Sequence, residues 1–186
     1  MTGIVLKQQL KCKTMKRIHF ILVFVFFSFS VQAQYVDRTN FRAGLNGGIV
    51  TGDFSEAYSL VLGIDLYQHW GVSKTIDLGV TTGFSNAFGE KQEVSAGGVL
   101  IETEFDNLQF IPLAVSVRIY PTTGFKLGGD VGYAVGINEG NEGGFYYRPS
   151  LGIDINSGTT ELNVSYMAVS GDITYSSVLF GLLFLF

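Results

Sequence analysis

Residues 175–186 read Tyr175-Ser176-Ser177-Val178-Leu179-Phe180-Gly181-Leu182-Leu183-Phe184-Leu185-Phe186, and they decide the fold. The stretch has the length of one strand, and it is more apolar than a solvent-exposed strand can be, because such an edge aggregates. Upstream segments alternate apolar residues with Gly, Ser and charged residues. This period of two residues is typical of strands that cross a membrane in a closed barrel. The sequence therefore predicts a transmembrane β-barrel.

The alternation defines eight candidate strands in an all-β, antiparallel, up-and-down barrel. In the clearest strand, Phe125, Leu127 and Val131 share one face, while Lys126 and Asp130 share the other. Gly-, Pro- and Ser-containing segments at 51–53, 121–124 and 157–159 predict turns between strands. The strands are expected at about 41–50, 58–68, 75–84, 111–120, 125–137, 144–156, 160–169 and 174–186.

The polar face of these strands consists mostly of glycine with a few charged residues. A soluble barrel such as a lipocalin is the alternative, but it would turn this face to water, and glycine makes a poor solvent surface. The face suits a narrow lumen in which opposite charges pair. We therefore expect a closed lumen with four basic and four acidic residues, namely Arg42, Asp65, Asp77, Arg118, Lys126, Asp130, Arg148 and Asp154.

The segment from Ser85 to Asp106 is the longest connection and leaves two interpretations open. Residues 99–105 continue the alternation of strand 111–120 above the membrane and pair with 86–94 in a protruding hairpin, or the whole segment is a mobile loop. A hairpin would offer an open edge to which a protein partner adds a strand. The partner would then bind through residues 85–106.

The N-terminal region has the features of a secretory signal peptide. Lys16 and Arg17 precede an apolar run at 18–31, and Ala33 and Gln34 flank the expected cleavage site. The run is shorter than the roughly 20 residues of a transmembrane helix, which is the alternative. We expect a signal peptide at 1–33, starting at Met1 or at Met15, then a short periplasmic segment at 34–40 and an outer-membrane barrel at 41–186.

Charge and cysteine usage exclude other classes of protein. All 16 acidic residues but only seven of the 12 basic residues follow Ala33, so the exported chain carries a formal charge of −9, which disfavours nucleic acid as a partner. The only cysteine of the full sequence, Cys12, precedes the apolar run, so the exported chain is expected to carry neither a lipid anchor nor a disulfide.

Two short segments carry a resemblance to a known family. Phe110-Ile111-Pro112-Leu113, followed by Arg118-Ile119-Tyr120-Pro121, resembles the IPL…KYYF strand of Bacteroidota barrel proteins, which include PorT-like chains. With the leader and the 153 residues after it, the chain is similar to the small outer-membrane β-barrel family of Gram-negative bacteria, built like the OmpA transmembrane domain and OmpX. The resemblance implies an assembly signal read by the barrel-assembly machinery, formed by Phe180, Leu182, Phe184 and Phe186.

No residue pattern predicts a catalytic, cofactor or metal site. His69 is expected in a periplasmic turn, far from the outer leaflet where lipid-modifying barrel enzymes act, and no nucleophile–base pair stands out. We interpret four aromatic residues near that end as an interfacial girdle, namely Tyr67, Trp70, Tyr120 and Phe125. The extracellular segments form an acidic rim with one basic residue, Lys91; its acidic residues are Asp53, Glu56, Glu90, Glu93, Glu102, Glu104, Asp106, Glu139, Glu142 and Asp172.

The sequence thus predicts a non-enzymatic integral protein of the outer membrane that contacts outer-membrane lipid and has a structural or partner-binding role. The alternatives are a small pore or transporter, a subunit of a larger envelope complex for secretion or motility, and a lipid-modifying enzyme. A charge-paired lumen disfavours the pore, and the absence of a histidine at the rim disfavours the enzyme.

Overall fold

A computed structural model describes residues 39–96, 99–155, 158–171 and 174–186, and the side chains of 92–104 are left out of the description. The expected signal peptide, its cleavage site at Ala33 and Gln34 and residues 34–38 lie outside the described residues. Within the described part, no helix combines the length and the apolar character needed to cross a membrane.

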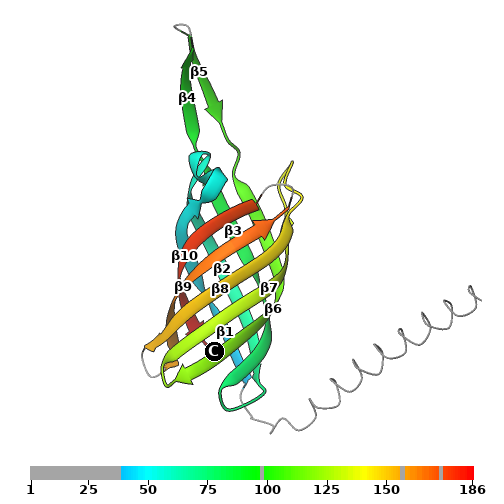
Figure 1. The fold of residues 1–186 in the computed structure, drawn as a ribbon, viewed down its shortest axis with the longest axis vertical. Helices are drawn as coiled ribbons and strands as arrows, with labels where there is room; N and C mark the ends of the chain where they lie inside the picture. Colours follow the sequence, from blue (N-terminus) through cyan, green and yellow to red (C-terminus); the bar gives the residue numbers. More distant parts are fainter. Residues whose placement is uncertain (1–38, 97–98, 156–157, 172–173) are drawn as a thin grey trace, which may run out of the picture. The chain divides into compact units, whose positions relative to one another are not determined.

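Eight strands close into one barrel in which all neighbours are antiparallel (Figure 1). Its neighbour order is β1-β10-β9-β8-β7-β6-β3-β2, and β2 pairs back with β1. The barrel strands are β1 (Thr39–Thr51), β2 (Tyr58–Gly71), β3 (Ile76–Gly89), β6 (Leu108–Thr122), β7 (Phe125–Gly136), β8 (Gly144–Ile155), β9 (Thr160–Ser170) and β10 (Thr174–Leu185). The predicted fold class is confirmed.

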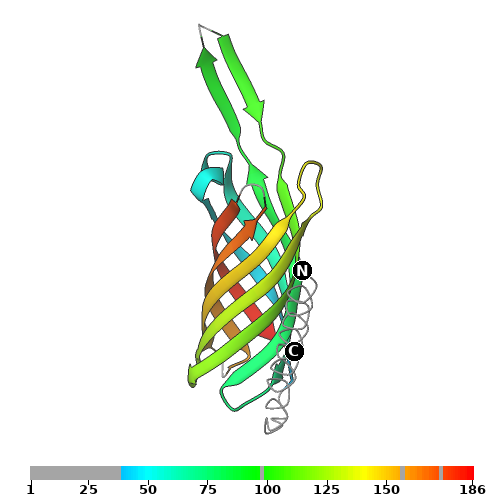
Figure 2. The same ribbon diagram turned by 45° about the vertical axis from the view of Figure 1, so that its right-hand side comes forward.

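The remaining elements lie at one end of the barrel. A 3-10 helix, η2 (Gly52–Glu56), connects β1 to β2. Strands β4 (Lys91–Ala96) and β5 (Val99–Glu104) form a separate two-stranded sheet between β3 and β6, and this hairpin extends beyond the barrel wall (Figures 1 and 2). The opposite end has only short turns between β2 and β3, β6 and β7, and β8 and β9. Short turns mark the periplasmic end and longer loops the extracellular end.

Of the two interpretations of residues 85–106, the structure has the hairpin, with one change of boundary. Residues 85–87 belong to the barrel, where Ser85 pairs with Phe110, Asn86 with Gln109 and Ala87 with Leu108. The apolar alternation weakens at these small and polar residues. The strand predicted at 75–84 therefore ends earlier than β3, which continues to Gly89. The hairpin begins only at Lys91, which pairs with Glu104.

The outer face of the barrel is apolar and exposed. Leu45, Val115 and Phe180 expose 62%, 64% and 64% of their surface, and the outward residues of the other strands follow the same pattern. Burying such a face in hydrocarbon is favourable, whereas water would leave it as a large apolar patch. A closed barrel also leaves no unpaired edge, so its backbone polar groups are satisfied within the wall. The soluble-barrel alternative is therefore wrong, because the apolar side chains point outward.

Glycines allow the strands to approach closely where the barrel closes between β1 and β10. A Cβ atom added at Gly44 would meet the backbone carbonyl of Leu182, and one added at Gly48 would meet that of Val178. Backbone atoms cannot move aside as a flexible side chain can, so these positions exclude side chains. A Cβ atom at Gly47, on the same strand, would lie 3.1 Å from the end of the Leu62 side chain and 3.5 Å from the Val61 carbonyl oxygen, and the latter is an ordinary van der Waals distance.

We predict that Gly44→Ala destabilises the barrel by about 1–3 kcal/mol, the range for overpacking a tightly packed site. The measurement is the urea midpoint of unfolding in detergent. The folded fraction is read from the difference in gel mobility between folded and heated protein. Gly47→Ala is the matched control and should leave the midpoint nearly unchanged. Equal midpoints for both variants would contradict the close approach at this seam.

Candidate functional site: the lumen and the extracellular mouth

Charged side chains line the lumen from its middle to its periplasmic end. All eight residues expected on the inward face lie there; Asp154 is half-buried and the other seven are buried. The structure adds Glu161, which is 3% exposed and was not among the predicted residues. Glu161 follows the alternation of β9 toward the lumen, so its parity with Asn163 and Ser165 was the signal that could have found it.

Asp130 is the centre of the network in the middle of the lumen. Its carboxylate accepts hydrogen bonds from the Tyr67 hydroxyl at 3.0 Å, the Ser116 hydroxyl at 2.6 Å and Nη1 of Arg118 at 3.1 Å. The Arg118 guanidinium also lies 4.6 Å from the centre of the Tyr67 ring. Several donors from β2 and β6 thus compensate the desolvation of one buried carboxylate on β7.

The hydrogen bonds of Ser116 fix the protonation pattern of its neighbour His69. The Ser116 hydroxyl has one proton, which it donates to Asp130, because a carboxylate only accepts. The bond of 2.9 Å between Ser116 Oγ and His69 Nε2 therefore has His69 as donor. In a nucleophile–base pair the histidine accepts the serine proton, so this arrangement is the reverse of an activated serine. His69 lies within β2 and faces the lumen, which corrects its expected place in a turn.

A second ion pair joins opposite sides of the barrel. Nη1 of Arg148, on β8, lies 2.7 Å from Oδ1 of Asp65, on β2, and Nε of Arg148 donates to Ser165 at 2.8 Å. All three residues are buried. An ion pair that spans the lumen holds the walls together and occupies the space between them.

The lowest layer gathers two basic and two acidic side chains. Lys126 Nζ pairs with Asp154 and lies 2.9 Å from Glu161, while Arg42 lies 3.5 Å from Glu161 and 3.8 Å from Asp154. Each carboxylate therefore faces two cations. If either carboxylate is removed, the other still lies beside both Lys126 and Arg42, so neither cation loses its last acidic partner.

Two of the four residues interpreted as an interfacial girdle lie elsewhere. Tyr67 is 3% exposed inside the lumen, and Tyr120 donates a hydrogen bond of 2.6 Å from the inward face of β6 to Asp77. Both residues lie near a strand end, where a girdle is expected, but their parity in β2 and β6 places them on the inward face. Trp70 and Phe125 lie on the outer wall, 48% and 37% exposed.

The extracellular half of the lumen is filled by apolar side chains, an arrangement that the alternation of the sequence does not predict. The mouth is crossed by tilted or edge-on aromatic contacts: Phe54 lies 5.9 Å from Tyr58 and 6.0 Å from Tyr175, and Tyr175 lies 5.3 Å from Phe110. This apolar layer consists of Val50, Tyr58, Val61, Ala87, Phe110, Ala114, Ala134, Tyr146, Met167, Val169, Tyr175 and Leu179.

An amide network holds the root of the hairpin against the loop between β7 and β8. Asn138 Oδ1 accepts from the backbone of Gln109 at 2.9 Å, and Asn138 Nδ2 donates to the carbonyl of Asn107 at 2.7 Å. Asn141 Nδ2 donates to the carbonyl of Gln109 at 2.7 Å. On the other side, the backbone of Glu90 donates to Ala57 at 2.8 Å. The hairpin is therefore fixed at its base from both sides.

The described residues hold no group of three or more His, Cys, Asp or Glu side chains arranged for a metal ion. Of the acidic rim, Asp172 lies outside the described residues. Six of its other acidic residues are exposed, namely Asp53, Glu56, Glu90, Asp106, Glu139 and Glu142.

Comparison with solved structures defines the class of protein. The fold is similar to Ail, the attachment invasion locus protein of Yersinia pestis: its crystal structure shares 12% identity over 79% of this chain and 96% of Ail, with a TM-score of 0.50. Ail in a phospholipid bilayer nanodisc shares 14% identity over 80% and 98%, with a TM-score of 0.52. A de novo designed transmembrane β-barrel shares 11% identity over 82% and 100%, with a TM-score of 0.51.

No protein-family model matches the chain, and no curated protein matches it either. At these identities the likeness to the solved structures concerns the fold alone. The chain is thus a small eight-stranded membrane β-barrel of the kind found in outer membranes. Its resemblance to PorT-like chains stays a prediction.

We predict that Asp130→Leu lowers the free energy of unfolding by about 3–5 kcal/mol, because Arg118 loses its carboxylate while buried. Asp154→Leu should cost about 1 kcal/mol or less, since Glu161 remains beside both Lys126 and Arg42. The measurement is urea unfolding of the barrel in detergent. A larger loss for Asp154→Leu than for Asp130→Leu would contradict the contrast between a single and a shared carboxylate.

Proposed function

We propose that this chain is a non-enzymatic, integral outer-membrane protein that presents the β4–β5 hairpin outside the cell as a binding element for another protein. It would reach the outer membrane through a cleaved signal peptide and be inserted by the barrel-assembly machinery. The observation that carries the proposal is a pair of β-strands that belongs to no barrel sheet and is fixed at its root.

The filled lumen supports a binding role over transport. Solutes would first have to pass the apolar layer at the mouth. They would then have to pass the layer of ion pairs at Asp65, Asp130 and Glu161, and the residues of both layers are buried. Eight strands enclose an interior that side chains can fill completely. Passage would require breaking buried ion pairs without a charged replacement, which is costly.

The hydrogen bonds around Ser116 argue against this residue as a nucleophile, which is consistent with the proposed non-enzymatic role. Ser116 is fully buried, and its hydroxyl proton points to Asp130 and not to His69. A lipid substrate on the outer wall has no access to this hydroxyl.

The hairpin suits recognition by strand addition. Within the described residues, β4 and β5 pair only with each other, so each keeps one edge whose backbone groups a partner strand can bind. Residues 90–106 contain Glu90, Glu93, Glu102, Glu104 and Asp106 against one basic residue, Lys91. An extended, basic segment of a partner protein would complement this charge.

We predict that the purified barrel shows no steady conductance in a planar bilayer, because both layers of the lumen are filled. The comparison is a variant in which Tyr175→Gly and Phe110→Gly remove two rings from the mouth; its conductance should also stay near zero, because the ion-paired layer below remains. A stable channel in the unmodified protein would overturn the closed lumen and favour a pore.

We predict that a photo-crosslinking residue placed at position 95, in the hairpin, captures a defined protein adduct in intact cells, whereas one at the exposed Ser55 of η2 does not. Replacing Glu93, Glu102 and Glu104 by Gln should weaken capture while leaving the barrel folded, because the proposed partner is basic. Identical adducts at both positions, or capture at position 95 that the Gln variant leaves unchanged, would contradict hairpin-specific recognition.

A further inference from the structure

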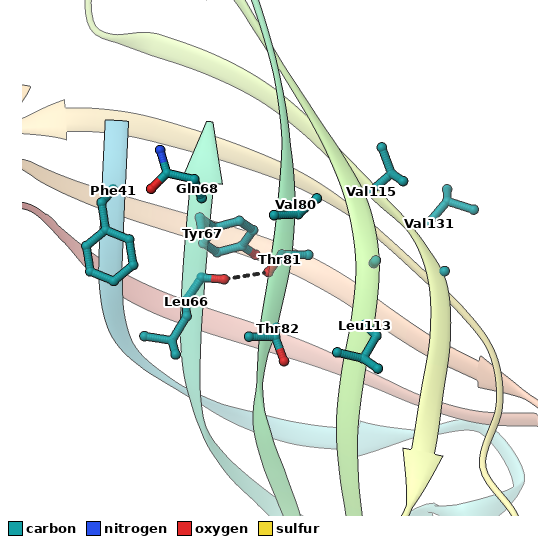
Figure 3. A pocket seen from close by; sticks show the side chains of 12 residues that line it. Phe41, Leu66, Tyr67, Gln68, Val80, Thr81, Thr82, Leu113, Val115 and Val131 are labelled. Carbon is teal, nitrogen blue, oxygen red and sulfur yellow. Dashed lines mark hydrogen bonds between the residues drawn. The ribbon is translucent and has the colours of Figure 1, made fainter. Parts of the chain in front are cut away.

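A furrow of about 570 Å³ crosses the outer wall over β1, β2, β3, β6 and β7 (Figure 3). Its volume falls in the roughly 300–1,000 Å³ range of small-molecule sites. The furrow lies on the lipid-facing side, outside the lumen, and the proposed binding role of the hairpin does not involve it. Its lining is apolar apart from two threonines and one glutamine.

The furrow follows from the register of the strands. One bank is a row of paired outward residues that includes Phe41, Gln68, Val80, Val115 and Val131, and the other includes Leu66, Thr82 and Leu113. The floor is the row between them, Tyr67, Thr81, Ala114 and Gly132, which are paired in that order. Because the side chains of Tyr67 and Thr81 point inward, the backbone of this row forms the bottom of the furrow (Figure 3).

The furrow descends from the middle of the wall to the periplasmic end. Val131 is the seventh residue of β7 counted from its periplasmic end. Phe41 is only the third residue of β1, and Gln68 is the fourth from the end of β2. An elongated apolar molecule in the furrow would thus have one end at mid-membrane depth and the other at the periplasmic interface.

Besides Thr81 and Thr82 on β3, the polar groups of this path lie at its interfacial end. Gln68 is half-buried beside Phe41, with an amide whose recorded hydrogen bond, to the carbonyl of His69, is long at 3.5 Å. Below it, the exposed Lys74 lies in the turn that joins β2 to β3. In the part of the chain that the structure describes, Lys74 is the one basic residue at the periplasmic end outside the lumen. Trp70, between the two, marks the interface.

We propose that the furrow is a binding site for one phospholipid of the periplasmic leaflet. One acyl chain lies in the furrow between Val80 and Leu113, the Gln68 amide donates to the ester region, and Lys74 binds the phosphate. The order of chemistry along the furrow (apolar chain, neutral amide, cation) is the order of groups along a phospholipid. Because Lys74 adds a charge interaction, anionic headgroups bind better than zwitterionic ones.

Trp70 is the only tryptophan of the chain and reports on this end of the furrow. The experiment reconstitutes the full barrel in phosphatidylcholine with increasing fractions of phosphatidylglycerol that is brominated near the start of one acyl chain, and it follows quenching of Trp70. We expect phosphatidylglycerol to be enriched roughly two- to fivefold at Trp70 over its bulk fraction. This is the fold-change in binding that one exposed ion pair produces. Brominated phosphatidylcholine serves as the reference lipid.

Two variants separate the site from ordinary contact with lipid. Lys74→Gln should abolish the preference for phosphatidylglycerol, and Thr82→Phe, which fills the furrow from its bank, should lower the enrichment while Trp70 stays in place. Val164→Phe, on the outer face of β9 and 43% exposed, is the matched control and should change neither. If quenching follows the bulk fraction of brominated phosphatidylglycerol in the unmodified barrel as well as in the variants, the proposal is overturned and bulk lipid is the only occupant.

Discussion

A membrane offers no hydrogen bonds to the backbone, and the rest of this structure depends on that constraint. Strands can cross hydrocarbon only if every N–H and C=O group is paired within the wall, which requires the sheet to close between β1 and β10. Closure then fixes which side of each strand faces lipid. The apolar side chains that would fill the core of a soluble protein lie outside, so the interior must be built from what remains.

Eight strands leave an interior that is narrow enough for side chains to fill, and this chain fills it in two ways. In the periplasmic half, carboxylates such as Asp130 and Glu161 are buried together with Arg118, Arg42 and Lys126, so each charge offsets the desolvation of another. In the extracellular half, aromatic rings around Tyr175 exclude water directly. Ion pairs tolerate little displacement, and packed rings tolerate little insertion, so both layers oppose passage through the barrel.

Much of this could be predicted from the sequence because the two-residue period is a local property. Parity alone placed the eight charged residues on the inward face, and the same rule applied consistently would have added Glu161 and moved Tyr67 and Tyr120 inside. The apolar layer was not predictable in the same way. Residues such as Val61, Leu179 and Met167 are apolar on a face expected to be polar, and only the three-dimensional register shows that they meet one another at one end of the lumen.

The same register accounts for the position of the two proposed binding surfaces, which lie outside the lumen. The interior is filled and Ser116 is buried within it, so the two binding surfaces that we propose lie at the rim and on the wall. At the rim, the amides of Asn138 and Asn141 hold the hairpin root, while β4 and β5 pair only with each other among the described residues. On the wall, pairing of Tyr67 with Thr81, and of Ala114 with Gly132, turns one row of residues inward and opens a furrow between its neighbours. One pattern of pairing therefore closes the sheet into a barrel and shapes its apolar outer wall.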